Sequence, residues 1–172
     1  MIVVALMQNP SKASAVGSDR TMDKWCGYMR RWYPDHAIGE PEMDAEPREP
    51  ESVYRYRLTR TWRALGVHQL TLRVGNIFAF RAMYPRDLWA AARVGNDIIG
   101  PENDVAIRRM VASANIVIAA WGCHANAQAR ALEVRAMLAT PLHVLRLSKH
   151  GRPEHPLYLP GDIVPVPWMV AT

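Results

Sequence analysis

Four short apolar runs, each ending in a polar or glycine-containing turn, constrain the fold of this chain most strongly. They span residues 2–7, 67–75, 115–121 and 142–147. Helical segments separate them, and parallel strands require such crossover connections. The pattern therefore predicts an α/β fold, a three-layer α/β/α sandwich around a four-stranded, mainly parallel central sheet.

The length of 172 residues fits a single domain over residues 1–172 with one hydrophobic core. Near the end of the chain, Val164, Val166 and Trp168 alternate with polar or proline positions. This alternation allows a short edge strand in an otherwise proline-broken tail.

Several segments between the apolar runs have helical periodicity. The first carries Met22, Trp25, Cys26 and Met29 on one face and should end before Pro34. Further helices are expected over residues 54–65, from Pro85 and Pro101, and over 124–138, with Val105 or Ala106, Met110 and Val111 facing inward from the third of these.

Residues 34–53 form an acidic, proline-rich insertion, which we expect to be a surface loop. It holds seven acidic side chains and one basic one, so its net charge is −6 and the remaining chain is +11 within a total of +5. A solvated linker and a regulatory or lid role both fit this composition. The basic remainder fits a nucleic-acid binder.

Composition excludes several classes of protein. No apolar run approaches the roughly 20 residues that span a bilayer, and no basic flank marks a signal peptide. We therefore expect a cytoplasmic protein with no membrane partner and a plausible monomeric state. Cys26 and Cys123 are too few for a four-cysteine cluster; both are expected in the core, unless Cys123 touches a ligand.

Neither a dinucleotide fingerprint nor a P-loop motif occurs, so no cofactor is predicted. The histidines lack the spacing of metal ligands, and no metal is predicted either.

Polar side chains follow each predicted strand. Asn9 follows the first, Asn76 the second, His124 the third, and His155 lies in the loop after the fourth. Because ligands of open α/β sheets bind beyond the carboxyl ends of the strands, these residues are expected to converge. Each also has a structural interpretation: Asn9 in a turn, Asn76 as a cap, and His155 as a hydrogen-bonded loop residue.

Five motifs resemble, in the same order, those of an uncharacterised bacterial and phage family. They are residues 7–11 (Met-Gln-Asn-Pro-Ser), 76–81 (Asn-Ile-Phe-Ala-Phe-Arg), 100–104 (Gly-Pro-Glu-Asn-Asp), 120–125 (Ala-Trp-Gly-Cys-His-Ala) and 151–159 (Gly-Arg-Pro-Glu-His-Pro-Leu-Tyr-Leu). This resemblance carries no assigned activity.

The same motifs resemble, more distantly, the uracil-DNA glycosylase superfamily. That resemblance implies a glycosylase-like fold in which Asn9 positions the attacking water, His155 donates to the departing base, and Asn76 reads the base edge. The full predicted set is Asn9 and His155 as catalytic residues; Gln8, Ser11, Asn76, Phe78, Arg81, His124 and Tyr158 as substrate-binding residues; and Lys149, Arg152 and Leu157 as nucleic-acid contacts.

One further aromatic side chain is expected to stack on the base, with Phe78, Phe80 and Trp25 as candidates. The loop after His155 reads Leu-Tyr-Leu, whereas the superfamily uses a serine-rich loop to pinch DNA. Three functions follow as hypotheses: an N-glycosylase acting on a uracil-like or modified base in DNA or a nucleotide, a non-catalytic nucleic-acid or nucleotide-binding module, and a phage-type base-modification enzyme.

Overall fold

The computed structural model describes residues 1–9, 20–34, 36–37 and 68–169. Its main element is a five-stranded sheet in the order β4-β1-β5-β6-β7. The strands are β1 (Ile2–Met7), β4 (Thr71–Asn76), β5 (Ile116–Ala119), β6 (Leu142–Val144) and β7 (Val166–Pro167).

The first four of these strands are parallel and coincide with the four predicted apolar runs, except that β4 begins only at Thr71 and extends one residue past its run, to Asn76. The fifth strand, β7, pairs antiparallel with β6 through Val144 and Val166. The sheet is therefore mixed and larger than the predicted four strands, because the alternating tail does form an edge strand. Proline is tolerated at position 167 because it lies in such an edge strand.

A second, two-stranded parallel sheet joins β2 (His36–Ala37) to β3 (His68–Gln69). The prediction of a loop throughout residues 34–53 is thus wrong at positions 36–37. The rest of that insertion and the helix predicted over 54–65 lie outside the described residues.

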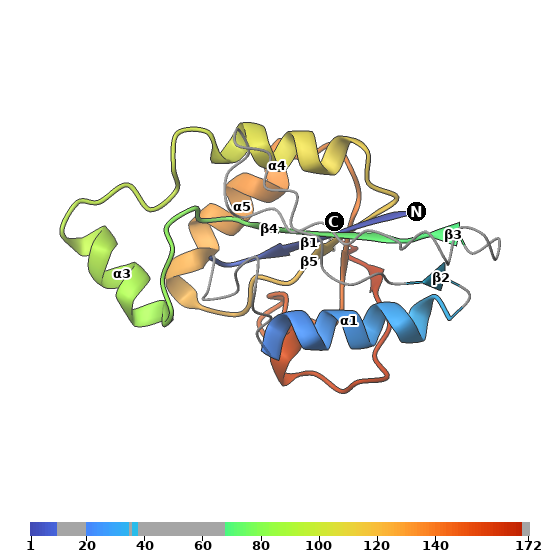
Figure 1. The fold of residues 1–172 in the computed structure, drawn as a ribbon. Coiled ribbons are helices and arrows are strands. Elements are labelled where there is room, and N and C mark those ends of the chain that lie inside the picture. The colour runs from blue at the N-terminus through green and yellow to red at the C-terminus, as the bar shows by residue number, and fades with distance from the viewer. Residues whose placement is uncertain (10–19, 35, 38–67, 170–172) are drawn as a thin grey trace.

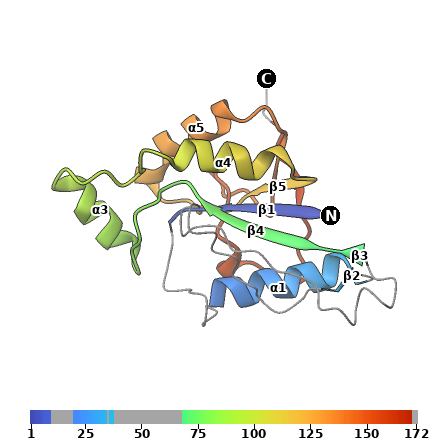
Figure 2. The same cartoon turned by 45° about the horizontal axis from the view of Figure 1, so that its top comes forward.

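Helices cover both faces of the five-stranded sheet (Figures 1 and 2). Figure 1 shows α1 (Arg20–Trp32) below the sheet and α4 (Asn103–Ala112) with α5 (Gln128–Met137) above it. The helix α3 (Pro85–Arg93) lies beyond the carboxyl ends of β1 and β4. This end of the sheet is where the predicted polar residues were expected.

The alternation of β1 explains why both faces are covered. Val3, Ala5 and Met7 join the apolar cluster on the α1 side, whereas Val4 and Leu6 join the cluster beneath α4 and α5. Successive side chains of a strand point to opposite faces, so a run of apolar residues must be buried on both sides.

The predicted inward faces of two helices need correction. In α4 the buried residues are Asn103, Ile107, Met110 and Val111, whereas Val105 is exposed. The helix begins at Asn103, and the three- and four-residue steps from there select Ile107. In α1, Tyr28 is buried and Cys26 only half-buried.

Within the described ranges, no helix is both long and apolar enough to cross a membrane.

Candidate functional site

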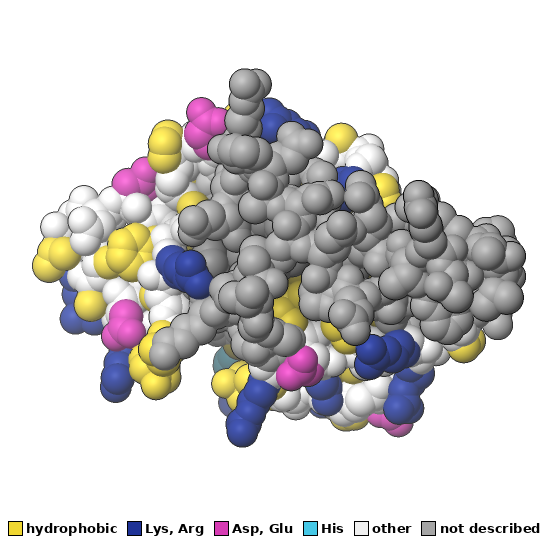
Figure 3. All heavy atoms as spheres, viewed as in Figure 1, with side chains coloured by type: hydrophobic (Ala, Val, Ile, Leu, Met, Phe, Trp, Pro, Cys, Tyr) yellow, Lys and Arg dark blue, Asp and Glu magenta, His cyan; other side chains and the backbone are white. Residues whose placement is uncertain are grey.

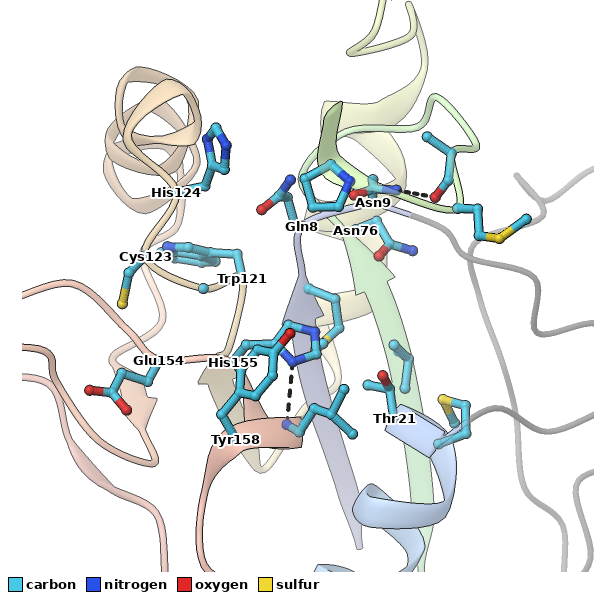
Figure 4. Close-up of a pocket in the computed structure, with 18 residues that line it drawn as sticks. Gln8, Asn9, Thr21, Asn76, Trp121, Cys123, His124, Glu154, His155 and Tyr158 are labelled. Atoms are coloured by element: carbon cyan, nitrogen blue, oxygen red, sulfur yellow. Dashed lines mark hydrogen bonds between the residues drawn. The ribbon is translucent and has the colours of Figure 1, made fainter. Parts of the chain in front are cut away.

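A pocket of about 500 Å³ opens at the carboxyl ends of the parallel strands. Its size is within the range of small-molecule sites. Figure 4 shows side chains around this space from the end of β1 and the residues after it, from β4, from the loop after β5 and from the loop after β6. Seven predicted residues line it: Gln8, Asn9, Asn76, His124, His155, Leu157 and Tyr158.

Two buried amides occupy neighbouring strand ends in this pocket. Met7 pairs with Asn76 across β1 and β4, so Gln8 follows the position opposite Asn76. Asn76 is 3% exposed and Gln8 9% exposed. The Nε2 of Gln8 has no hydrogen-bond partner among the described residues. A buried, unsatisfied polar group costs free energy, so the protein alone does not satisfy the Gln8 amide.

Backbone hydrogen bonds extend the pairing of these strands past their ends. Ile77 N donates to the carbonyl oxygen of Met7 and Phe78 N to that of Gln8, both at 2.9 Å. The carbonyl oxygen of Ile77 accepts from Nδ2 of Asn103 and Nε of Arg130, each at 2.9 Å. The backbone that follows Asn76 is therefore hydrogen-bonded to Met7 and Gln8 on one side and to α4 and α5 on the other.

Asn9 lines the pocket and also holds the chain after β4. Its Nδ2 donates to the carbonyl oxygen of Ala82 at 2.8 Å (Figure 4). Asn9 therefore has a structural contact with the chain after β4 as well as a place in the pocket lining.

His155 precedes the short 3₁₀ helix η2 (Pro156–Tyr158). Its Nδ1 accepts a hydrogen bond from the backbone N–H of Leu157 at 3.3 Å. A neutral imidazole with an accepting Nδ1 carries its proton on Nε2, so this ring is a donor through Nε2. The ring centroid of Tyr158 lies 5.8 Å from that of His155, and Tyr158 is 78% exposed.

The helix α1 anchors the loop that carries His155. The hydroxyl of Tyr28 lies 3.2 Å from the carbonyl oxygen of Pro156 and 3.0 Å from that of Pro160. Burial raises the pKa of the Tyr28 hydroxyl, and the positive charge of Arg146 partly offsets this rise. The hydroxyl is therefore protonated at neutral pH and can donate its single proton to either carbonyl oxygen.

His124 has the same local geometry as His155. Its Nδ1 accepts from the backbone N–H of Asn126 at 3.3 Å, before η1 (Ala125–Ala127). Its ring stacks on Trp89, with a centroid distance of 5.0 Å and an interplanar angle of 26°. These contacts hold the ring at the rim of the pocket (Figure 4).

The loops that carry the two histidines are tied to each other. Nη1 of Arg152 donates to the carbonyl oxygen of Cys123 at 3.2 Å. The Cys123 thiol lies 3.6 Å from the carbonyl oxygen of Pro153. Cys123 is exposed and lines the pocket, so its expected core position is wrong and the ligand-contact alternative is the geometrically possible one.

The remaining predicted residues lie elsewhere. Phe78 is buried and packs edge-on against Trp89, at a centroid distance of 5.3 Å. It belongs to the core cluster that also contains Leu88 and Trp89 of α3. Arg81 and Lys149 are exposed, and neither they nor Arg152 line the pocket.

Ser11 lies outside the described residues. Among the stacking candidates, Trp25 is fully buried in the core on the α1 side, and Phe80 packs against the other core cluster.

Among the pocket residues that the sequence did not predict, Trp121 and Glu154 bear most on its chemistry. Trp121 is the pocket's indole, 2% exposed, with its ring centroid 5.9 Å from that of Trp168. Its place at the end of the third apolar run was the available signal. Glu154 is the pocket's one carboxylate among the described residues, and its Oε2 accepts from Nε and Nη2 of Arg146 at 2.9 and 2.6 Å.

Basic side chains gather outside the pocket. Figure 3 shows Lys and Arg side chains along the lower edge of the molecule, where Figure 1 places α1. This helix carries Arg20, Lys24, Arg30 and Arg31 but only one acid, Asp23. No group of three or more potential metal ligands occurs in the part of the chain that the structure describes.

The fold and pocket define an α/β protein with a ligand-sized site at the carboxyl ends of its parallel strands. The chain belongs to the DUF1643 family, described as a protein of unknown function, which matches residues 57–157. This match confirms the predicted membership of an uncharacterised family and includes Asn76, Trp121 and His155. No curated protein matches the chain, and no solved structure matches it.

Proposed function

We propose that this pocket binds a nucleobase, and that the protein is an N-glycosylase-like hydrolase acting on a uracil-like or modified base in DNA or in a nucleotide. The observation that carries the proposal is the pair of buried amides in the pocket lining, Gln8 and Asn76, of which Gln8 has a buried Nε2 without a partner among the described residues. The proposal includes a fold arranged like that of the uracil-DNA glycosylases.

Amide side chains suit a base edge because each offers both a donor and an acceptor. A nucleobase presents alternating donors and acceptors in one plane, so two amides at adjacent strand ends can satisfy several of them. Rotation of the Gln8 amide toward the pocket would let its Nε2, which has no partner among the described residues, donate to a ligand acceptor such as a ring carbonyl. Trp121 supplies an aromatic side chain to the same pocket lining.

In the proposed reaction, the oxygen of a water molecule bonds to C1′ of the sugar and the N-glycosidic bond breaks. The bonding electrons leave with the base, which takes up a proton, while the water loses one to solvent. Nε2–H of His155 would stabilise the charge that develops on the departing base. Such preorganised donors act most strongly in sites that exclude water.

The pocket offers little general-base chemistry. Asn9 is an amide and would orient a water molecule without deprotonating it. Glu154, the described carboxylate of the lining, accepts two hydrogen bonds from Arg146. The proposed hydrolysis therefore relies on a cation-like transition state and is expected to be slow.

The test is incubation with oligonucleotides that carry uracil, a mismatch or a modified base, followed by alkaline cleavage at abasic sites. We expect abasic product from the wild type and from Asn96→Asp, a control in an exposed loop. Asn76→Asp should abolish it, because a carboxylate cannot donate to the base. Absence of product from every substrate, with folded wild-type protein, would overturn the hydrolase proposal.

A non-catalytic base-binding module is the second candidate. Two contacts favour it, because they occupy the groups that hydrolysis would use. Nδ2 of Asn9 donates to the carbonyl oxygen of Ala82, and Glu154 forms an ion pair with Arg146. If it is correct, single-stranded DNA will bind without cleavage, and the affinity will fall steeply as salt rises. Absence of binding at low salt would rule this candidate out.

A further inference from the structure

We propose that Arg130 and Asn103 are positioning residues: by holding the carbonyl oxygen of Ile77, they fix the two pocket amides in the geometry that binds the ligand. This inference rests on the base-binding function proposed above. It concerns side chains that lie outside the pocket lining.

The two hydrogen bonds to the Ile77 carbonyl oxygen come from two helices on the same face of the sheet. Asn103 begins α4 and Arg130 lies in the first turn of α5. Their donors, Nδ2 and Nε, each lie 2.9 Å from the carbonyl oxygen of Ile77. A carbonyl oxygen has two lone pairs, so both acceptor positions are used, by elements separated in sequence from residue 77 by 26 and 53 positions.

Burial makes these two hydrogen bonds difficult to break. Asn103 is 3% exposed and Arg130 6% exposed. The guanidinium charge is compensated by ion pairs with Asp104 and Glu133. A buried charged donor that is paired and hydrogen-bonded is difficult to displace, because its removal from these partners would leave a desolvated charge.

The Ile77–Phe78 peptide, whose carbonyl oxygen accepts these bonds, lies next to both amides. Asn76 directly precedes Ile77, and Phe78 N donates to the carbonyl oxygen of Gln8. Loss of these contacts would free the Ile77–Phe78 peptide to rotate, which would break the hydrogen bond to Gln8 and loosen the backbone that follows Asn76. A shift of about 1 Å in a binding group can cost orders of magnitude in function.

The first experiment uses the ligand-free protein. NMR spectra of the Asn76 side-chain amide would be compared between wild type, Arg130→Gln, Asn103→Ala and the control Arg109→Gln, whose parent side chain is exposed on α4. We expect shifted and broadened Asn76 resonances in the first two variants and wild-type resonances in the control. Arg130→Lys, which keeps a charge for Asp104, should partly restore the signal. If Arg130→Gln does not fold, Asn103→Ala and Arg130→Lys decide the question.

The second experiment is calorimetric titration with free uracil and with deoxyuridine monophosphate as probes. Positioning predicts an affinity about tenfold lower in Arg130→Gln and Asn103→Ala, equivalent to about 1.4 kcal/mol, measured far below the unfolding midpoint. A merely structural role would lower the unfolding midpoint alone. Unchanged Asn76 resonances and unchanged affinity in folded variants would overturn the inference. If wild type binds neither probe, base binding fails, and the NMR comparison still decides the positioning role.

Discussion

The hydroxyl of Tyr28, in α1, lies within hydrogen-bonding distance of the carbonyl oxygen of Pro156, the residue that follows His155. One side of the pocket is thus attached to a helix far away in the sequence, with a separation of 128 positions between donor and acceptor. Replacing Tyr28 by Phe removes this attachment and keeps the ring. We expect a loss of about 1 kcal/mol in the free energy of unfolding, measured by urea denaturation, together with weaker probe binding.

The same residue predicts a dependence of stability on alkaline pH. Burial raises the pKa values of Tyr28 and Tyr33 above the ordinary value of 10.0. Between the unfolded and folded pKa values, the unfolded chain loses these protons and the folded chain keeps them, so the contribution to stability is complete below pH 10 and falls as pH rises further. Urea midpoints at pH 9 to 11 should show this fall. It should be shallower in Tyr28→Phe; an equal slope would contradict the assignment.

Gln8→Met should separate stability from binding. The apolar, similarly shaped side chain removes the buried donor that lacks a partner, whose desolvation typically costs about 1–3 kcal/mol. We expect the ligand-free variant to be at least as stable as wild type and its affinity for uracil to be lost. Thermal unfolding and calorimetry measure the two effects. A destabilised Gln8→Met variant would mean that Gln8 contributes to the fold through its polar group.

Glu154→Gln tests whether the pocket contains a general base. The side chain is 23% exposed and pairs with Arg146, which is 48% exposed. Such exposed pairs contribute about 0–1 kcal/mol to stability. If base release proceeds without a general base, the variant should keep its single-turnover rate on a uracil-containing oligonucleotide within a few fold. Complete loss of cleavage by a folded variant would assign Glu154 as the base.

Gly122→Ala and Gly27→Ala form a matched pair with opposite expectations. Gly122 has a φ of 87°, and a Cβ there would lie 3.6 Å from Cβ of His155. The cost is therefore mainly that of the left-handed backbone, about 1–2 kcal/mol. Gly27 is inside α1 with no atom within 4 Å of an added Cβ. Alanine there should stabilise the helix by about 0.5–1 kcal/mol. Chemical denaturation compares both.

Asn9→Asp tests the hydrogen bond to Ala82. A carboxylate would face the carbonyl oxygen that Nδ2 now contacts at 2.8 Å. We expect a loss of about 1–3 kcal/mol at neutral pH, the cost of leaving such a group unsatisfied, with partial recovery at acidic pH where the carboxyl protonates. Denaturation at pH 4 and pH 7 measures the difference. A gain in cleavage rate despite this loss would support a water-positioning role.

The strands and the polar residues that follow them could be predicted because both depend on local sequence. An apolar run buried on two faces, followed by a turn, is visible without knowledge of the rest of the chain, and this placed Asn76 and His155 near each other. Phe78 was misassigned because the register continued past Asn76. The continued pairing depends on the backbone of Gln8, which follows the neighbouring strand β1. No pattern in the sequence around Phe78 indicates this contact.

The contacts of Asn103 and Arg130 could not be predicted for a related reason. Both act through one carbonyl oxygen, and backbone carbonyls have no sequence signature. Their convergence on Ile77 depends on how α4 and α5 are placed over β4. Trp121, in contrast, ended a predicted strand and could have been recognised by the same rule that identified His124.

The antiparallel strand β7 has a consequence for the solubility of the sheet. Trp168 N donates inward to Leu142, so the backbone of Pro167, one residue earlier, faces away from β6. Proline has no N–H to donate to another chain. At that position the outermost strand offers no donor to an incoming strand, and such edges resist the edge-to-edge pairing that leads to aggregation.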